Sequence, residues 1–317
     1  MSQTAQVAGA GVLQEQAAGH RRRSKKPPLS EGAKAERRLG WLLCAPAVLV
    51  MIAITAYPIG YAIYLSLERY DLRFPNAAKF IGLDNYGTVL SSGYWWHAFF
   101  VTLIITAISV SIELVLGMAI ALLMFRAPFF RGGLRTAVLI PYGIVTVVAA
   151  FSWQFAWTPG IGYLAGLSGG APLTHTASAI AIIILAEVWK TTPFMALLLM
   201  AGLSLVPEDL QNAAKVDGAT AWQRFVRITL PLMKPAILVA LLFRTLDAFR
   251  IFDNIFVLTA GAHNTGSVSI LGYDNLFTAL NLGVGSAISI LIFICTAIIS
   301  FIFIKLFGTA APGQEVR

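Results

Sequence analysis

Residues 207–219 read Pro-Glu-Asp-Leu-Gln-Asn-Ala-Ala-Lys-Val-Asp-Gly-Ala, a polar stretch set between two long apolar segments. Pro207 suits the first position of a helix, and the two acidic residues after it complement the positive end of a helix dipole. Gly218 comes where the helical pattern stops, and a glycine adopts positive φ without the steric cost that a Cβ imposes. The stretch therefore predicts a short helix that ends at a glycine corner.

A second short helix is expected over residues 220–228. Trp222, Phe225 and Val226 recur at a spacing of three or four residues, which places them on one apolar stripe of a helix. Pro231 is expected to end this helix, because proline lacks a backbone N–H. Residues 206–231 are thus predicted to form a two-helix segment. An ordinary loop across a membrane face fits the same pattern equally well.

The composition indicates an integral membrane protein. The chain is 57% hydrophobic and 12% charged, whereas a soluble globular chain carries roughly a quarter charged residues. The net charge of +8 does not indicate a nucleic-acid partner, because the basic residues lie beside apolar segments. Cys44 and Cys295 lie far apart inside apolar runs and predict neither a disulfide framework nor a metal cluster.

Six apolar runs are each long enough to cross a bilayer core of about 30 Å. They cover residues 41–67, 96–124, 134–157, 177–205, 235–258 and 285–307. We therefore expect an all-α membrane protein of six transmembrane helices, with the two-helix segment in the cytoplasm between the fourth and the fifth. Residues 1–38 form a basic tail expected to be disordered, residues 39–308 the transmembrane domain, and residues 309–317 a second tail.

The distribution of basic residues predicts the orientation. Outside the spans, seventeen lysine and arginine residues fall on the side of the N-terminus and three on the other side. Positive charge is retained on the cytoplasmic face of membrane proteins. Both termini and residues 206–231 are therefore expected in the cytoplasm, with the chain in the plasma membrane.

Several kinds of chemistry are absent from the sequence. It has no glycine-rich phosphate loop ending in Gly-Lys-Ser/Thr, so the chain is not expected to hydrolyse a nucleotide itself. Its four histidines have no metal-ligand spacing, and no nucleophile lies near a base in a recognisable pattern. We expect no catalytic residue, no metal and no cofactor in this chain.

The fifth span carries charges at every third position: Arg244, Asp247, Arg250 and Asp253. Charges inside a membrane are costly unless they are paired or face a wet cavity. Neighbours three residues apart on a helix can neutralise one another, so the set could brace the helix. Alternatively it forms a polar wall along a substrate path, with Asn254 adding a donor and an acceptor. The pattern favours neither over the other.

The fourth span repeats this spacing with Glu187 and Lys190, followed by Thr191 and Phe194. An ion pair, a hydroxyl and an aromatic ring suit a sugar, which needs polar partners and an apolar face. Glu113 in the second span has no local partner, so we expect it to reach another helix. The predicted substrate path consists of Lys190, Thr191, Phe194, Arg244, Asp247, Arg250, Ile251 and Asn254.

Three blocks of sequence carry a family resemblance. Asn212-Ala213-Ala214-x-x-Asp217-Gly218-Ala219, followed by Leu230-Pro231, resembles the EAA loop of ATP-binding cassette (ABC) importer permeases. The flanking blocks, Trp189-Lys190-x-x-Pro193-Phe194 and Phe252-Asp253-x-Ile255-x-Val257-Leu258-Thr259-x-Gly261, are similar to those of the binding-protein-dependent sugar permeases of the MalF/UgpA type. The blocks occur in the family's order, and the resemblance extends from the first span to the C-terminus.

The resemblance implies a permease that forms half of the path for a sugar, for example a disaccharide such as trehalose. The implied partners are a second permease chain in a heterodimer, two ATP-binding subunits that hold ATP and Mg²⁺, an extracytoplasmic sugar-binding lipoprotein and the lipid bilayer. The EAA loop would couple to the ATPase through Glu208, Asp209, Asn212, Ala213, Ala214, Asp217, Gly218 and Ala219. The family's usual glutamate is Asn212 here, so either Glu208 or Asp209 replaces it, or the sister permease contributes more of the docking.

The expected mechanism is alternating access, in which ATP binding and hydrolysis in the partner subunits move the two permease halves. A rival is an ion-coupled secondary transporter that uses Asp247 and Asp253 as ion sites. The sequence has no evident inverted repeat, and its EAA-like segment argues against that rival. A membrane-embedded enzyme is disfavoured because no catalytic constellation is present.

Overall fold

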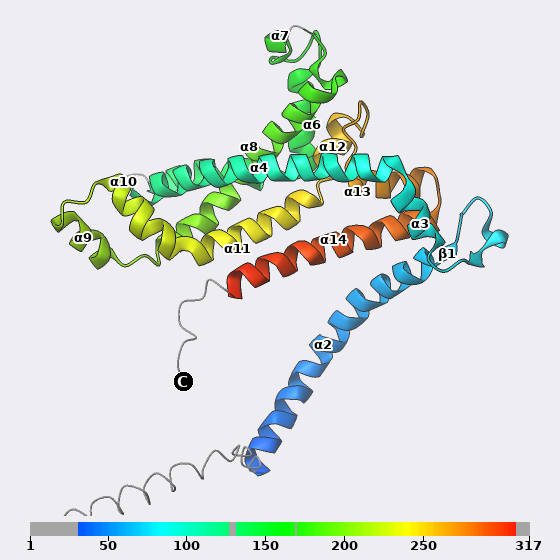
Figure 1. Ribbon diagram of the computed structural model, residues 1–317, viewed down its shortest axis with the longest axis horizontal. Helices are drawn as coiled ribbons and strands as arrows, with labels where there is room; N and C mark the ends of the chain where they lie inside the picture. The colour runs from blue at the N-terminus through cyan, green and yellow to red at the C-terminus, as the bar shows by residue number, and fades with distance from the viewer. Residues whose placement is uncertain (1–30, 127–130, 169, 309–317) are drawn as a thin grey trace, which may run out of the picture. The chain divides into compact units, whose positions relative to one another are not determined.

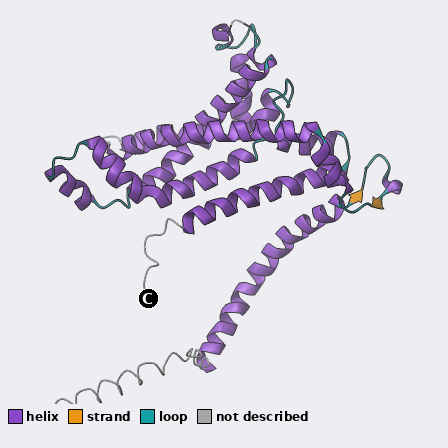
Figure 2. Cartoon of the chain, in the orientation of Figure 1, coloured by secondary structure: helices purple, strands orange, loops and turns teal. Residues whose placement is uncertain are grey.

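The computed structural model describes residues 31–126, 131–168 and 170–308 (Figure 1). Most of the expected N-terminal tail and all of the tail 309–317 lie outside these ranges. Within them the chain is helical apart from loops and two strands of two residues each (Figure 2). It divides into two compact units after Pro58.

The first unit contains most of α2, which covers Glu31–Ser66 and includes Pro46 and Pro58. Its apolar stretch Arg38–Ser66 is long enough to cross a membrane, in agreement with the first predicted span. None of the most apolar part of that stretch is buried within the chain.

The second unit holds the remaining elements. Its α-helices are α3 (Asp84–Ser91), α4 (Gly93–Arg126), α5 (Arg131–Gly143), α6 (Thr146–Trp157), α7 (Ala165–Ser168), α8 (Thr176–Leu203), α9 (Glu208–Val216), α10 (Ala221–Arg224), α11 (Leu230–Phe249), α12 (Asp253–Leu258), α13 (Val268–Tyr273) and α14 (Leu282–Gly308). The 3-10 helices are η1 (Pro75–Ala77) and η2 (Pro172–Thr174), and the π-helices are η3 (Phe225–Thr229) and η4 (Asp274–Thr278). Strands β1 (Glu68–Arg69) and β2 (Lys79–Phe80) pair antiparallel.

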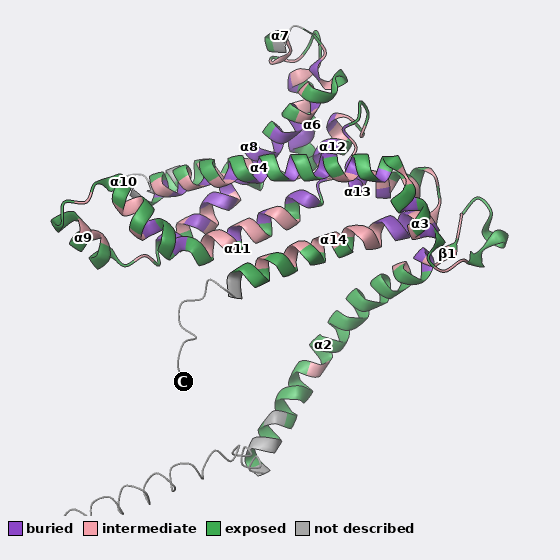
Figure 3. Cartoon of the chain, in the orientation of Figure 1, coloured by how far each residue is buried: buried purple, intermediate pink, exposed green. Residues whose placement is uncertain are grey.

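Helix α8 forms the centre of this unit. It packs against α4, α5 and α11, and α11 also contacts α4 and α14 (Figure 1). In its apolar window 72% of the residues are buried, against 39% in α4 and 11% in α14 (Figure 3). Ile105, Ile183 and Ile255 are fully buried where α4, α8 and α12 meet.

The membrane-crossing helices agree with the predicted fold class, with one change. Among the described residues five helices are long and apolar enough to span a membrane, and there are six such spans if a bent pair is counted as one. That pair is the predicted third span 134–157, in which Arg135–Gly143 and Thr146–Trp157 meet at 89°. The third apolar run is therefore broken into two helices rather than forming one straight helix. Pro141 and Gly143 lie just before the bend, and both residues weaken a helix interior.

The fifth predicted span, 235–258, is also modified at both ends. The prediction that Pro231 ends a helix is wrong: Pro231 lies in the first turn of α11, directly after the π-turn η3. The π-turn η3 joins α10 to α11 without a break, and the Leu230 N–H donates to the Phe225 carbonyl. At the other end α11 stops at Phe249, and three irregular residues precede α12. The span is therefore a helix followed by a separate short helix.

Candidate functional site

A cavity of about 540 Å³ lies at the bend of the third span. Helices α5, α6, α8, α11 and α12 and the two irregular linkers contribute its walls. The lining residues are Tyr142, Ile144, Val145, Thr146, Glu187, Lys190, Thr191, Asp247, Arg250, Ile251, Phe252, Asp253 and Asn254. Most of these are polar or charged, although they belong to membrane-spanning segments. Charged side chains within a membrane indicate a functional site.

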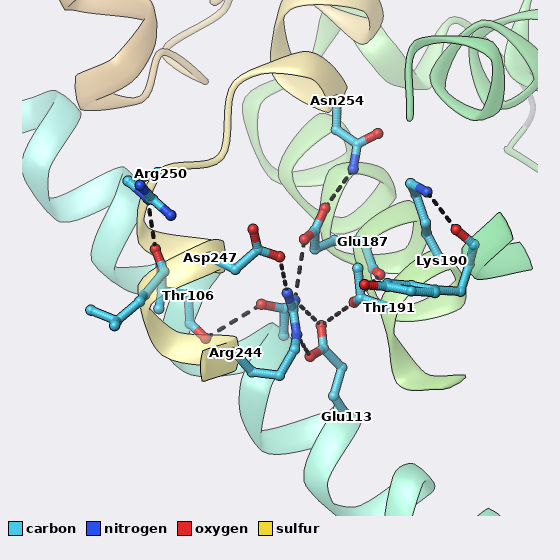
Figure 4. A network of polar contacts seen from close by, with 12 residues as sticks. Thr106, Glu113, Glu187, Lys190, Thr191, Arg244, Asp247, Arg250 and Asn254 are labelled. Carbon is cyan, nitrogen blue, oxygen red and sulfur yellow. Dashed lines mark hydrogen bonds and ion pairs between the residues drawn. The ribbon is translucent and has the colours of Figure 1, made fainter. Parts of the chain in front are cut away.

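Beneath this cavity, Arg244 binds three carboxylates (Figure 4). Its Nε donates to Glu113 Oε2 at 2.6 Å and its Nη2 to Glu113 Oε1 at 2.9 Å, a two-point contact. Nη2 also donates to Glu187 Oε1 at 3.2 Å, and Nη1 donates to Asp247. The Arg244 side chain is 1% exposed and that of Glu113 is 0% exposed. Each buried charge thus has an opposite charge within hydrogen-bonding distance, which offsets its desolvation.

Uncharged groups complete the network. Thr191 Oγ1 donates to Glu113 Oε1 at 2.8 Å, and Asn254 Nδ2 donates to Glu187 Oε2 at 2.5 Å. Residues from α4, α8, α11 and α12 therefore meet in one cluster. The prediction that Glu113 reaches another helix is confirmed, and its partner is 131 positions away in the sequence.

Lys190 has a different partner from the one predicted. Its Nζ donates to the carbonyls of Ile144 at 2.7 Å and Tyr142 at 3.4 Å, at the bend between α5 and α6. Those carbonyls lie at the end of α5, where no further turn of helix is present to satisfy them. The ammonium also lies 5.8 Å from the centre of the Tyr142 ring. The expected ion pair with Glu187 is wrong, because Glu187 binds Arg244 and Asn254 instead.

The charge ladder of the fifth span is only partly formed. Among the described residues, ion pairing along it is confined to Arg244 and Asp247. Arg250 follows the last residue of α11, and its Nε donates to the Leu246 carbonyl at 3.3 Å. Asp253 opens α12 after the irregular linker. The spacing of three stops placing side chains on one helix face once the helix has ended, so within the described chain the ladder's pairing goes no further than Asp247.

Most of the predicted path residues lie together. Six of the eight line the cavity: Lys190, Thr191, Asp247, Arg250, Ile251 and Asn254. Arg244 is buried behind the lining residues. Phe194 stacks on the cavity residue Tyr142, with 5.3 Å between the ring centres. The predicted path left out seven lining residues: Glu187 and Asp253, the aromatic Tyr142 and Phe252, and, at and just after the linker between α5 and α6, Ile144, Val145 and Thr146. Pro141 and Gly143 inside an apolar run were the available signal for that linker.

The predicted two-helix segment has a well-defined local structure. Gly218 has φ of 78°, which confirms the predicted corner, and the Ala219 N–H donates to the Ala214 carbonyl to close α9. Thr220 and Gln223 then form a capping box that opens α10. Gln211 Nε2 donates to Thr229 Oγ1 at 2.9 Å and joins α9 to the π-turn. Pro207 caps α9 rather than taking its first helical position.

The side chains of this segment are largely exposed. None of the nine residues of α9 is buried, and Trp222 on α10 is 71% exposed. Asn212 Oδ1 accepts a hydrogen bond from Lys215 Nζ at 3.0 Å. The described residues contain no group of three or more histidines, cysteines or acidic residues placed to hold a metal ion.

Comparison with known proteins identifies the class. The family model for the binding-protein-dependent transport system inner membrane component matches residues 113–310. The trehalose transport system permease protein SugA of Mycobacterium tuberculosis is 66% identical over 89% of this chain and 92% of the relative. The trehalose/maltose transport system permease protein MalF of Thermococcus litoralis is 40% identical over 85% and 94%.

A solved structure has the same fold. The bacterial ABC transporter involved in the import of the acidic polysaccharide alginate contains a chain that matches with a TM-score of 0.74 at 23% identity, over 88% of this chain and 99% of that chain. The present chain belongs to the family of binding-protein-dependent transport system inner membrane components. It is a multi-pass membrane permease of the ABC importer class, and thus a transport subunit rather than an enzyme.

Proposed function

We propose that this chain forms half of the translocation path of an ABC sugar importer and that its sugar is a disaccharide such as trehalose. The polar cavity of about 540 Å³ among the membrane-spanning helices carries this proposal. Its volume lies in the range of about 300–1,000 Å³ that is usual for small-molecule sites. The names of the relatives, a trehalose permease and a trehalose/maltose permease, favour a disaccharide.

The cavity offers hydrogen-bonding groups that suit sugar hydroxyls. Asp247 binds Arg244 through Oδ2, and within the described chain Asp253 makes no side-chain hydrogen bond, so both present carboxylate oxygens. Within the described residues Arg250 donates through its Nε alone, to the Leu246 carbonyl, which leaves the rest of its guanidinium to donate. The rings of Tyr142 and Phe252 add apolar faces. Together these groups match the alternating polar and apolar surface of a sugar.

We assign coupling to residues 206–231. Their helix caps fix the backbone locally, while Leu210, Val216 and Trp222 remain exposed. A preorganised surface with an exposed aromatic anchor suits docking onto a protein partner. The residues assigned to this contact are Glu208, Asp209, Asn212, Ala213, Ala214, Asp217, Gly218 and Ala219. The partner is an ATP-binding subunit that supplies ATP and Mg²⁺.

The assembly follows from this role. A second, related permease chain completes the path, two ATP-binding subunits bind the coupling segments, and a sugar-binding lipoprotein delivers the substrate. Both termini and residues 206–231 face the cytoplasm, as the bias of basic residues indicates. ATP binding and hydrolysis then move the permease halves between outward- and inward-facing states.

A reconstituted complex tests the proposal. We expect the chain to co-purify with a second permease and ATP-binding subunits, and trehalose with the binding protein to stimulate ATP hydrolysis. Uptake into vesicles should require ATP inside the compartment with the ATPase subunits and should persist when ionophores collapse the ion gradients. Uptake that stops with the ionophores and proceeds without ATP would instead support the ion-coupled rival.

A further inference from the structure

Arg244 binds carboxylates that differ in their exposure and in their position relative to the cavity. The Glu113 side chain is 0% exposed and lies outside the cavity lining. The Asp247 side chain is 66% exposed and lines the cavity, as does Glu187. One guanidinium therefore joins a carboxylate outside the cavity lining to two carboxylates in the lining, of which Asp247 is open and Glu187 is 9% exposed.

The contacts also differ in strength. Glu113 accepts from both Nε and Nη2 at 2.6 and 2.9 Å and is held by Thr191 as well. Glu187 accepts from Nη2 alone at 3.2 Å, from a nitrogen that it shares with Glu113. Two-point arginine–carboxylate contacts are stronger and geometrically more specific than single ones. The bond to Glu113 is thus the fixed one, and the bond to Glu187 is the one most easily exchanged.

The position of Arg244 links these bonds to the coupling segment. Residues 221–249 form one uninterrupted helical element through α10, η3 and α11. At 1.5 Å per residue, the twenty residues from Arg224 to Arg244 cover about 30 Å. Gln211 ties α9 to this element at Thr229. The Arg244–Glu187 bond joins the element to α8, so a change in that bond reaches the coupling segment through a continuous helix.

We propose that Arg244 is a positioning residue that reports whether the cavity is filled. In the empty cavity it holds Glu187 and ties α11 to α8, while Glu113 keeps the guanidinium in place. When sugar binds, its hydroxyls donate to Glu187 and Asp247 in place of Arg244. The Arg244–Glu187 bond, which joins α11 to α8, is then broken. The released α10–α11 element then signals occupancy to the ATPase. This role rests on the proposed function of the cavity.

Two isosteric variants on either side of the same arginine test the proposal. Both Glu187→Gln and Glu113→Gln remove one negative charge from a buried partner of Arg244. Glu187→Gln breaks the exchangeable tie, so ATP hydrolysis without sugar should rise about fivefold, while the bond to Asn254 is retained. Glu113→Gln removes the fixed partner and shifts the guanidinium onto Glu187 and Asp247. Hydrolysis without sugar should not rise, and the KM for trehalose uptake should increase about fivefold.

The complex with its binding protein, placed in lipid nanodiscs, provides both measurements. A rise of sugar-free hydrolysis in Glu187→Gln without a rise in Glu113→Gln supports the proposal. A rise in both variants, in neither, or in Glu113→Gln alone would overturn it, because a simple brace does not distinguish its two ends. If Glu113→Gln does not assemble, Glu113→Asp keeps the charge on a shorter side chain and should give a smaller rise in KM. A wild-type complex that no sugar stimulates would contradict the proposed function itself, whatever the variants do.

Discussion

The cavity network and the coupling segment are both polar, but different contacts hold them in place. In the coupling segment the bonds join near neighbours, such as Ala219 to Ala214 and Gln223 to Thr220. In the network they join distant residues: Arg244 and Glu113 lie 131 positions apart, and Asn254 and Glu187 lie 67 apart. The coupling segment is exposed, whereas the centre of the network is fully buried.

This difference determines what each region can tolerate. A segment held by its own caps keeps its shape when its surroundings move, which suits a part that transmits motion between proteins. A network whose members come from α4, α8, α11 and α12 holds those helices together, and its loss affects the whole unit. We therefore expect changes in the network to alter folding and changes in the coupling segment to alter coupling alone.

The largest expected effect is that of Arg244→Met, which removes the cation and roughly keeps the side-chain length. Glu113 and Glu187 would remain buried without an opposite charge. Breaking a buried pair by removing one partner costs about 3–5 kcal/mol. Thermal unfolding of the purified complex should show this loss, together with reduced abundance in the membrane.

Arg244→Lys is the matched control for that change. Lysine keeps the charge but cannot bind Glu113 at two points, so its unfolding temperature should lie between those of wild type and Arg244→Met. A wild-type unfolding temperature for Arg244→Met would show that the network does not hold the helices together. The contrast between the two regions would then be unfounded.

Gly218→Val tests the coupling segment. A Cβ at Gly218 would meet no atom within 4 Å, so the cost arises from its φ of 78° alone. Left-handed backbone costs an ordinary residue about 1–2 kcal/mol, and β-branching makes it worse. We expect normal assembly in the membrane but reduced transport, with ATP hydrolysis that no longer responds to sugar. Gly218→Asn should retain most of the activity, because asparagine tolerates this conformation. Full transport by Gly218→Val would show that the glycine corner is not needed for coupling.

The same contrast explains which features the sequence predicted. The glycine corner and the α9 helix were predicted because their causes lie within a few residues of one another. The partners of Glu187 and Lys190 were predicted wrongly, because the spacing of three describes neighbours on one helix and not residues of other helices. The charges themselves marked the site correctly, since six of the eight predicted path residues line the cavity. Their pairing depends on the packing of four elements, which no local pattern contains.

The breaks in the helices are the other features that local patterns described incompletely. Pro141 lies in an apolar run and Pro231 at the end of the coupling segment; the chain bends by 89° just after Pro141 but continues as helix through Pro231. At the first site Lys190, 48 positions away, satisfies the Tyr142 carbonyl. At the second the π-turn accommodates the proline. The outcome at a proline thus depends on which groups are available to satisfy the backbone.

Arg250→Gln tests whether an exposed cavity residue affects sugar binding without affecting stability. Arg250 is exposed, and in the part of the chain that the structure describes it donates only through Nε, to Leu246. Its loss should change the free energy of unfolding by about 0.5 kcal/mol or less, as for other exposed positions. If it donates to sugar hydroxyls, the KM for trehalose uptake should rise severalfold, and Arg250→Lys should recover part of it. An unchanged KM would exclude Arg250 from the sugar contacts.

The smallest expected effect is that of Asn212→Glu, which restores the family's usual residue in the coupling segment. Asn212 now accepts a hydrogen bond from Lys215, and a glutamate could keep that contact as an ion pair. It would also place a third carboxylate within one turn of Glu208 and Asp209, and like charges at that spacing destabilise by about 0.2–0.5 kcal/mol. If Glu208 or Asp209 already binds the cation of the ATPase subunit, the added charge should loosen docking slightly.

Release of the ATPase subunits, measured against salt concentration for wild type and Asn212→Glu, separates the cases. Clearly tighter binding in the variant, lost at high salt, would mean that the cation is unpaired in the wild type. The neighbouring acids would then not compensate for Asn212, and a bond to a charged partner would replace a neutral one.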